Sequence, residues 1–433
     1  MLLHLATLST SSINFAAGAP VLAAKTQRAG EYVFFPQTLR RVAGMPDTLV
    51  MSYQSDADEL HDDGWTGGLL GSSDGATWHA IPQPHSPMLV KSCFEPDDQS
   101  LKCYEYPLRK LAANSSDDTH ARLGWQLYTA STSAPGGLRQ TSAGEATVTF
   151  PADKHLKSWG DNTFLMVADG KVLSMPLPGV HQQERLLLLY GKYGVNSTKY
   201  ALVATHSTDE GATWAYLSDV SYGAPSPCDN PSEHDCTWMA DFKTIMCVWR
   251  SEGTAKTLCE SRTIDRGRTW TPAQPLSGSS EEQPGEGTLP STLPSTPIGV
   301  EPKLERLTNG LLVVSAGRPG LYLWVAVDPS APGSSGANAT AALTWQGFNV
   351  AAHHNAAVTD PSLRYSSDTP SSSETTSYTG MVVQSLEVAG ESGVVVSYDR
   401  LANGWSPAPY PPPASGGKGL SALFTVRVNI SKA

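Results

Sequence analysis

Short apolar runs alternate with turn residues along most of the chain. Asp169-Gly170 and Asn309-Gly310 each lie between two such runs. Asp-Gly and Asn-Gly in this setting are strong signals of a tight β-hairpin, because these residues tolerate positive φ. No helical period of ~10–15 residues alternates with the runs, which disfavours a parallel α/β sheet. The pattern predicts an all-β chain of short antiparallel strands.

A second pattern is a turn motif of the form Ser/Thr-x-Asp-x-Gly-x-Thr-Trp. Copies occupy residues 207–214 and 263–270, and a copy that is one residue shorter occupies residues 72–78. Serine, aspartate and glycine each favour turns, through local side-chain hydrogen bonds or through tolerance of positive φ. We expect the motif aspartate to accept backbone N–H groups across a hairpin turn, and the tryptophan to pack on the next unit. The motif aspartates are Asp74, Asp209 and Asp265.

Degenerate copies of the motif run from Asp328 to Trp345 and from Asp399 to Trp405. The first interval between motif tryptophans is about twice the others, so one unit there lacks the motif. A repeat of ~40–60 residues that is made of short strands indicates a β-propeller. We predict six four-stranded antiparallel blades, at residues 30–85, 86–155, 156–225, 226–295, 296–355 and 370–433.

Composition excludes several classes of protein. Only 16% of the 433 residues are charged, too few for a coiled coil, and 40% are hydrophobic, too many for a disordered chain. The apolar runs are far shorter than the ~18 residues of a membrane span. The net charge of −11 argues against nucleic acid as a partner, although a local arginine cluster could still bind an anionic ligand. We expect a monomer.

The cysteines and glycosylation sequons favour a secreted protein. There are six cysteines, and Cys247 and Cys259 are symmetric about Gly253. A hairpin turning there would bring them within disulfide reach, and unpaired core cysteines are the alternative. No Cys-x-x-Cys occurs, so we expect no metal site. Asn-x-Ser/Thr sequons lie at Asn114, Asn196, Asn338 and Asn429.

The N-terminal segment is moderately apolar but has no lysine or arginine before its apolar part. It is therefore a poor match to a signal peptide. We interpret residues 1–28 as a leader or a disordered arm, followed by one propeller domain over residues 29–433. Secretion, or passage through the lumen of the secretory pathway, is the predicted location.

The turn motifs resemble the Asp boxes of the sialidase superfamily, and the resemblance covers residues ~30–433. It implies an exo-acting glycoside hydrolase that cleaves a terminal sialic acid, or a related acidic sugar, from a glycan. It implies three arginines that hold the sugar carboxylate, a tyrosine nucleophile with an acidic partner, and a separate aspartate as acid/base. It implies retention of configuration and no cofactor.

Two segments of the chain resemble the arginine-bearing segments of this family. Residues 235–250 resemble its Glu-strand-turn-strand-Arg segment, which makes Arg250 a clamp arginine and Asp235, or nearby Glu233, the partner of the tyrosine. Residues 299–320 make Arg318 a second clamp arginine, and Glu301 could supply a carboxylate to the same mouth.

Residues 376–383 resemble the family's tyrosine-bearing strand start, which makes Tyr378 the nucleophile. Asp399 follows 21 residues later in a sequence similar to the family's Tyr-Glu, where it would orient an arginine. Asp399 is also a degenerate turn-motif position, so a structural role is the alternative.

The first unit departs from the family, because Phe34 stands where the first clamp arginine belongs. Arg40 and Arg41 follow, but strand alternation lets only one of them face the pocket, and we assign Arg41 as the candidate. The acid/base has several candidates, of which we select Asp62, next to Asp63. The departure leaves two alternatives open: a non-catalytic propeller that binds a glycan or a protein, and a hydrolase that acts on a neutral or differently charged polysaccharide.

Overall fold

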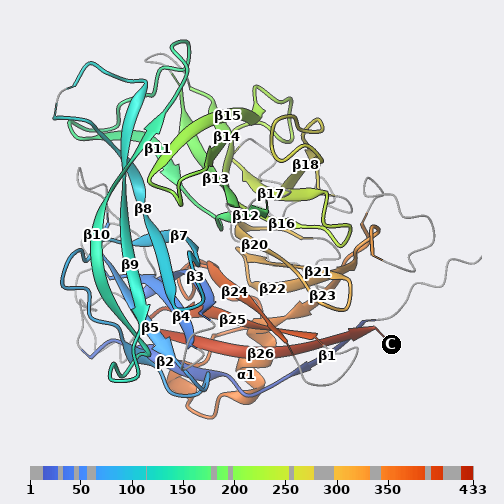
Figure 1. The fold of residues 1–433 in the computed structure, drawn as a ribbon. Helices are drawn as coiled ribbons and strands as arrows, with labels where there is room; N and C mark the ends of the chain where they lie inside the picture. Colours follow the sequence, from blue (N-terminus) through green and yellow to red (C-terminus); the bar gives the residue numbers. More distant parts are fainter. Residues whose placement is uncertain are drawn as a thin grey trace, which may run out of the picture.

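The computed structural model describes residues 13–27, 33–42, 48–55, 65–113, 115–176, 183–193, 198–252, 258–276, 297–331, 343–385, 392–402 and 421–432. These residues are almost all in β-strands or in the turns between them, as the hydrophobic pattern predicts. The sheets surround a common centre in a propeller-like arrangement (Figure 1). The strands that lie toward this centre are β3 (Phe34–Val42), β7 (Val90–Phe94), β16 (Pro231–Trp238), β20 (Val300–Arg306) and β24 (Thr379–Ser385).

Three of the sheets have four strands in sequence order. The first contains β3 (Phe34–Val42), β4 (Thr48–Gln54), β5 (Gly67–Ser72) and β6 (His79–Ala80). The second contains β16 (Pro231–Trp238), β17 (Ile245–Ser251), β18 (Leu258–Thr263) and β19 (Gln274–Pro275). The third contains β20 (Val300–Arg306), β21 (Leu311–Gly317), β22 (Leu321–Val327) and β23 (Gln346–Asn349), and it is followed by helix α1 (Val350–Ala357).

The largest sheet has nine strands and spans two of the predicted units. The first of these units contributes β7 (Val90–Phe94), β8 (Ser100–Lys110), β9 (His120–Ala130) and β10 (Leu138–Thr149). The other contributes β11 (Thr163–Ala168), β12 (Leu173–Pro176), β13 (Gln183–Lys192), β14 (Tyr200–Ser207) and β15 (Thr213–Tyr222). β10 pairs in parallel with β15, and β11 pairs with β8, so the strand pairing closes on itself as a barrel.

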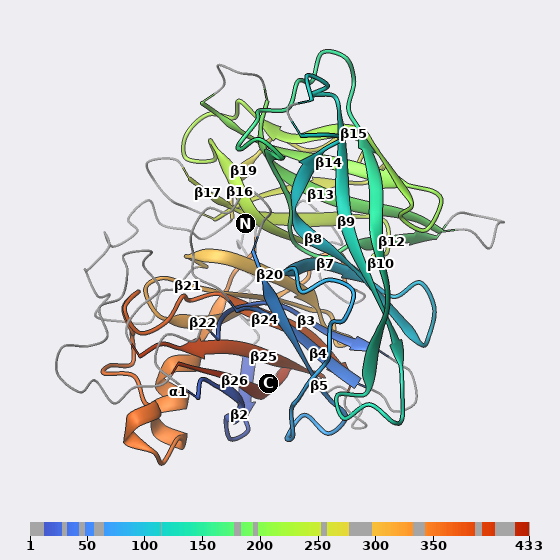
Figure 2. The same ribbon diagram turned by 90° about the vertical axis from the view of Figure 1, so that its left-hand side faces the viewer.

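The described strands therefore form five sheets, where the sequence predicts six separate blades. The physical reason is the length of β8, β9 and β10, which run side by side in Figure 2 and extend beyond their own unit. An unpaired strand edge exposes backbone N–H and C=O groups, and pairing with β15 satisfies those of β10.

The fifth sheet unites the two ends of the chain. It contains β24 (Thr379–Ser385), β25 (Ser392–Arg400) and β26 (Ala422–Lys432), and β26 also pairs with β1 (Ile13–Ala17) and β2 (Val21–Lys25). The expectation of a disordered arm over residues 1–28 does not hold for these two strands. Ile13 is buried and Phe15 stacks on Phe348 with ring centroids 5.4 Å apart, so β1 covers an apolar face.

The first strands close the ring at the centre of the molecule. β24 lies against both β3 and β20, β16 lies against β20, and β3 lies against β7. Apolar clusters fill the spaces between neighbouring sheets, and the largest joins the β20–β23 sheet to the β24–β26 sheet. The functional groups described below come from these central strands and from the turns that follow them.

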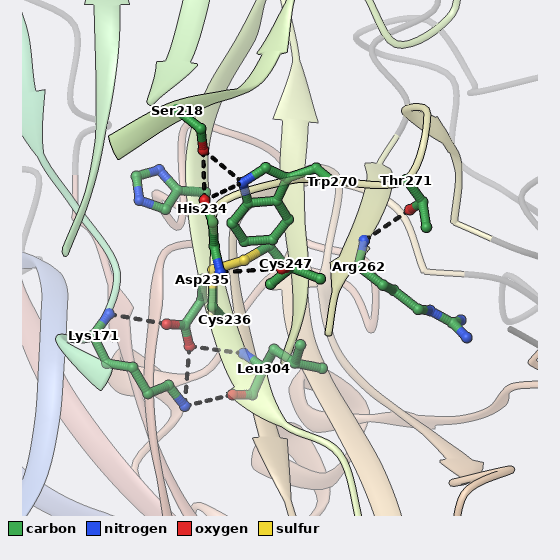
Figure 3. The surroundings of a disulfide bond; sticks show 12 residues. Lys171, Ser218, His234, Asp235, Cys236, Cys247, Arg262, Trp270, Thr271 and Leu304 are labelled. Carbon is green, nitrogen blue, oxygen red and sulfur yellow. Dashed lines mark hydrogen bonds and ion pairs between the residues drawn. A yellow bond between two sulfur atoms is a disulfide. The ribbon is translucent and has the colours of Figure 1, made fainter. Parts of the chain in front are cut away.

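Three copies of the turn motif adopt the same hydrogen-bonded turn at the outer edge. Asp74, Asp209 and Asp265 each accept a hydrogen bond from the backbone N–H of the motif threonine, at 2.7–2.9 Å. The tryptophans pack on the preceding unit, not on the next one: Trp214 lies edge-on to Tyr104, and Trp270 donates to Ser218 (Figure 3).

Three disulfides join all six cysteines, in a pairing that differs from the expected Cys247–Cys259 bond. The bonds are Cys93–Cys103, Cys228–Cys259 and Cys236–Cys247. In the β17–β18 register, Cys247 lies opposite Ser261, two residues from the predicted partner, so it bonds across to Cys236 on β16. Gly253, the predicted turn centre, lies outside the described residues. Three disulfides are typical of proteins that fold in an oxidising, secretory environment.

Candidate active site

A tyrosine and a glutamate from two different sheets meet at the centre of the ring. Tyr378 precedes β24, and its hydroxyl donates a hydrogen bond to Oε1 of Glu233 on β16. The Tyr378 side chain is half-buried, whereas Glu233 is only 5% exposed. Tyr378 is therefore the more accessible of the two residues. We call this pair the Tyr–Glu dyad.

The carboxylate of Glu233 is held by several donors besides Tyr378. Its Oε2 accepts from Nη1 of Arg250 at 3.2 Å and from the backbone N–H of Glu301 at 2.9 Å. Burial alone would raise the pKa of Glu233, but Arg250, the tyrosine hydroxyl and Lys91 outweigh it and lower the pKa to about 2. Burial, followed by the charge of Glu233, raises the pKa of Tyr378 well above its usual value.

The dyad can carry out one simple proton transfer. The Tyr378 proton already points to a carboxylate, so an attack by the phenol oxygen would pass that proton directly to Glu233. Glu233 cannot easily act as a nucleophile itself, because both of its oxygens are engaged and its side chain is buried.

Two further side chains enclose the tyrosine ring. Arg318 follows β21, its guanidinium lies 5.6 Å from the ring centroid of Tyr378, and its Nη2 donates to the carbonyl of Thr376 at 2.7 Å. On another side the ring of Phe35 meets Tyr378 edge-on, with centroids 4.7 Å apart, and Phe34 packs on Phe35. Both phenylalanines are buried.

Four buried charges lie next to the dyad and alternate in sign. Lys91 lies 3.6 Å from Asp169 and 3.5 Å from Glu301, and Lys303 lies 2.6 Å from Glu301 and 3.9 Å from Asp169. We call these four residues the axial charge ring. Glu301 connects the ring to the dyad, because its backbone N–H binds Glu233 while its side chain binds both lysines.

Glu301 is strained and electrostatically unusual. Its φ of 44° lies in the left-handed region, which non-glycine residues rarely adopt. Burial, together with the negative charge of Asp169, raises its pKa to about 7 despite the two lysines. Glu233 and Glu301 are thus neighbouring carboxyl groups with pKa values displaced in opposite directions.

Asp399 does not contact an arginine in the way that the sequence predicts. Its carboxylate accepts from the backbone N–H of Phe35 at 3.0 Å and of Thr376 at 2.8 Å, and from the hydroxyl of Thr375 at 2.8 Å. Within the described part of the chain it forms no ion pair with an arginine. Because the chain has no arginine at the Phe34 position, the buried carboxylate binds the two backbone segments that carry Phe35 and Tyr378.

Asp235 also lies away from the dyad, contrary to its predicted role as the partner of Tyr378. It accepts from the backbone N–H groups of Lys171 at 3.0 Å and Leu304 at 2.9 Å, and it lies 3.3 Å from the Lys171 ammonium (Figure 3). Asp235 therefore ties three sheets together. Glu233, which the sequence offered as the alternative, occupies the position next to Tyr378.

The remaining predicted residues are not brought to the dyad. Arg41 is exposed on β3, while Arg40 turns inward and lies 3.8 Å from Glu305, near Asp235. Asp62 lies outside the described residues. Among the residues that the structure describes, no group of three or more metal-ligating side chains is placed to hold a metal ion.

Sequence reasoning missed Phe35, Lys91 and Asp169 as neighbours of the dyad. Asp169 was visible only as half of an Asp-Gly turn signal, although it is fully buried. Lys91 follows the apolar residues Leu89 and Val90, at the start of a strand that enters the centre. A lysine in such a position was the signal that could have indicated a buried charge.

The sequence matches no protein-family model and no curated protein. Several solved structures share the fold. A protein of unknown function from Dyadobacter fermentans has a TM-score of 0.57 at 13% identity, over 97% of this chain and 99% of that one. An α-L-arabinanase from Penicillium chrysogenum, solved with arabinobiose, has a TM-score of 0.51 at 12% identity, over 95% and 98% of the two chains.

A Hadza microbial sialidase has a TM-score of 0.50 at 12% identity, over 91% of this chain and 65% of that one. At these identities the likeness concerns the fold. The similar structures include glycoside hydrolases of two different substrate classes, so the fold alone does not select a substrate. No helix in the described part of the chain is long and apolar enough to cross a membrane.

Proposed function

We propose that the protein is a glycoside hydrolase that retains configuration, with Tyr378 as nucleophile and Glu233 as its base. The hydrogen bond from the Tyr378 hydroxyl to Glu233 carries this proposal. A half-buried phenol beside a buried, fully bonded carboxylate is suited to this division of roles. A glycan is the proposed substrate, and secretion the proposed location.

The reaction would take two steps. The phenol oxygen of Tyr378 attacks the anomeric carbon, its proton passes to Glu233, and the glycosidic C–O bond breaks as an acid protonates the leaving oxygen. Water then attacks the anomeric carbon of the glycosyl-tyrosine and gives a proton to the conjugate base of that acid, while the Tyr378 oxygen leaves and recovers its own proton from Glu233. Asp62 stays the sequence candidate for the acid.

The role of the arginines is part of the same proposal. Arg250 keeps Glu233 ionised, and Arg318 lies over the tyrosine ring, where a cation stabilises negative charge that develops on the phenol oxygen. The three-arginine clamp expected for an acidic sugar would need a third arginine, and Phe34 holds that position.

A mechanism-based trap tests the proposal directly. A panel of aryl glycosides identifies a substrate, and its 2-fluoro analogue is then expected to add one glycosyl mass to the peptide that contains Tyr378. Tyr378→Phe should abolish both turnover and labelling. The matched control is Tyr398→Phe, which removes a buried hydroxyl bonded to His354 and should keep turnover. Labelling of another residue would contradict the assignment of the nucleophile.

A non-catalytic, glycan-binding protein is the second candidate, and the observation that favours it is the pair Phe34 and Phe35 in place of a clamp arginine. A glycan array with the purified protein separates the two functions. Saturable binding without release of product would support the second candidate, and release of product would exclude it.

We also propose that the nine-stranded sheet represents two blades, β7–β10 and β11–β15, that have fused along their outer strands. Each is a consecutive antiparallel ladder, and their union would complete a ring of six. A single propeller body over residues 13–433, present as a monomer, is the architecture that follows.

A further inference from the structure

The surroundings of the Tyr–Glu dyad indicate which class of sugar it accepts. A sugar with a carboxylate on its anomeric carbon would place a negative charge within a few ångströms of the attacking oxygen. Such a charge is costly to remove from water unless cations that are not already neutralised receive it. The charges that line the dyad therefore decide between an acidic and a neutral sugar.

The cations next to the dyad are matched by acids. Arg250 lies 3.2 Å from Glu233 and 3.2 Å from Glu252. Lys91 and Lys303 share Asp169 and Glu301 within the axial charge ring. With Arg318 included, four cations face four carboxyl groups, and all four carboxyl groups are ionised above a pH of about 7, the value to which burial raises the pKa of Glu301. A bound carboxylate would have to compete with Glu233 and Glu252 for Arg250, and it would leave the site with an excess of negative charge.

The wall on the β3 side is apolar. Phe34, Phe35 and Leu401 form a buried cluster against which Tyr378 packs. The backbone N–H of Phe35 is bound to Asp399, and its φ of 48° directs the chain so that the phenylalanine ring meets the tyrosine edge-on. Asp399 thus holds an aromatic wall in place. Its carboxylate binds the backbone of this wall and does not pair with an arginine in the described part of the chain.

We propose that the sugar bound at the dyad is a neutral glycoside that carries no carboxylate on the reacting ring. This inference rests on the proposed function, and it names the substrate class of that same site. Hydroxyl groups of a neutral sugar can hydrogen-bond to Arg250 and Arg318 without displacing the carboxylates of Glu233 and Glu252 from Arg250. The apolar wall excludes charge from the side of β3.

The experiment compares neutral and acidic substrates on the wild-type protein. The neutral 4-methylumbelliferyl glycosides are the α-L-arabinofuranoside, the galactoside, the glucoside, the xyloside and the fucoside, and the acidic ones are the sialoside and the glucuronide. We expect turnover within the neutral group, with a KM that changes less than about twofold between low and high salt, because no ionic contact is screened. Higher kcat/KM for an acidic glycoside would overturn the inference and leave the proposed function intact.

Absence of turnover on the whole panel, and on natural polysaccharides, would instead contradict the proposed function and remove the basis of the inference. The two failures are therefore distinguishable.

A single charge change tests the cause. Glu252 is about one-third exposed and pairs with Arg250, so Glu252→Gln should fold and leave the site with one more positive charge. We expect competitive inhibition of the neutral activity by free sialic acid to strengthen about tenfold in this variant. The matched control is Glu210→Gln, which removes the same charge beside Arg185 at the outer edge and should leave inhibition unchanged. Equal inhibition of the wild type and Glu252→Gln would contradict the charge-balance argument.

Discussion

Glu233 and Asp235 lie two residues apart on β16, and both carboxylates accept a backbone N–H from β20. They differ in their remaining partners. Glu233 receives the hydroxyl of a half-buried tyrosine, whereas Asp235 receives the backbone and the ammonium of Lys171. Two buried acids with nearly the same backbone environment thus have different roles. The partner from a third sheet, a tyrosine hydroxyl for Glu233 and a lysine for Asp235, distinguishes the candidate catalytic acid from the structural one.

The first prediction concerns the chemical side of this comparison. Glu233→Gln removes the proton acceptor of Tyr378 but keeps the shape of the side chain. We expect kcat/KM to fall by about 10²–10⁴-fold, the usual contribution of a positioned general base. Steady-state kinetics on the best glycoside measure this change. Activity within tenfold of the wild type would show that Glu233 is not the base.

The second prediction concerns the structural side. Asp235→Asn removes the carboxylate that accepts the backbone N–H groups of Lys171 and Leu304, while the Lys171 ammonium keeps its ion pair with Glu305 at 2.6 Å. We expect a cost of about 1–3 kcal/mol of unfolding free energy, as for a buried donor that loses its acceptor. Denaturant titration measures the loss, and kcat/KM well below the new transition should stay close to the wild-type value. A variant that keeps its stability but loses activity would reverse the roles of the two acids.

The third prediction sharpens the comparison with a neighbouring acid, Glu301. Its pKa is raised from 4.5 to about 7, so the folded protein holds this proton more tightly than the unfolded chain does. The resulting stabilisation is complete below pH 4.5 and is lost as the pH rises through about 7, a change of about 3 kcal/mol. Glu233, whose pKa is lowered from 4.5 to about 2, contributes the opposite dependence: its stabilisation is complete above pH 4.5 and is lost as the pH falls through about 2.

The measurement is the unfolding free energy of the wild type and of Glu301→Gln between pH 4.5 and 8. The decline over this window should be smaller in the variant. Parallel pH profiles for the two proteins would show that Glu301 does not titrate there.

The smallest expected effect is at the outer edge. Asp209 accepts the backbone N–H groups of Ala212 and Thr213, but its turn is exposed. Asp209→Ala should cost about 1 kcal/mol, as the loss of a comparable cap does, and it should not change kcat/KM. Thermal unfolding and steady-state assays test both parts. A loss of activity would place this turn in contact with the chemistry.

Local signals predicted much of the fold. The Asp-Gly and Asn-Gly hairpins and the repeated turn motif depend on residues that are close in sequence, and they correctly indicated short antiparallel strands around a centre. Interactions between distant segments were not predictable in this way. A register shift of two residues moved the partner of Cys247 from Cys259 to Cys236, and strand pairing between β10 and β15 fused two predicted units.

The candidate site was predictable to a similar extent. The segments that carry Tyr378, Arg250 and Arg318 were identified from the sequence, and the structure brings them together. The choice between Glu233 and Asp235 was not predictable, because residues two apart on a strand share a face and only the third sheet distinguishes them. The contacts of Asp399 were not predictable either. The sequence shows that an arginine is missing at the Phe34 position, but the backbone groups that bind Asp399 depend on packing between distant segments.

The pairing of β26 with β1 and β2 affects how the chain acquires its structure during synthesis. Strands β1 and β2 are synthesised about 400 residues before their partner β26. Until β26 has been synthesised, β1 and β2 lack the strand with which they pair, and the intermediate sheets must form as an open arc. The final step joins segments about 400 residues apart, and its entropic cost grows only with the logarithm of that separation.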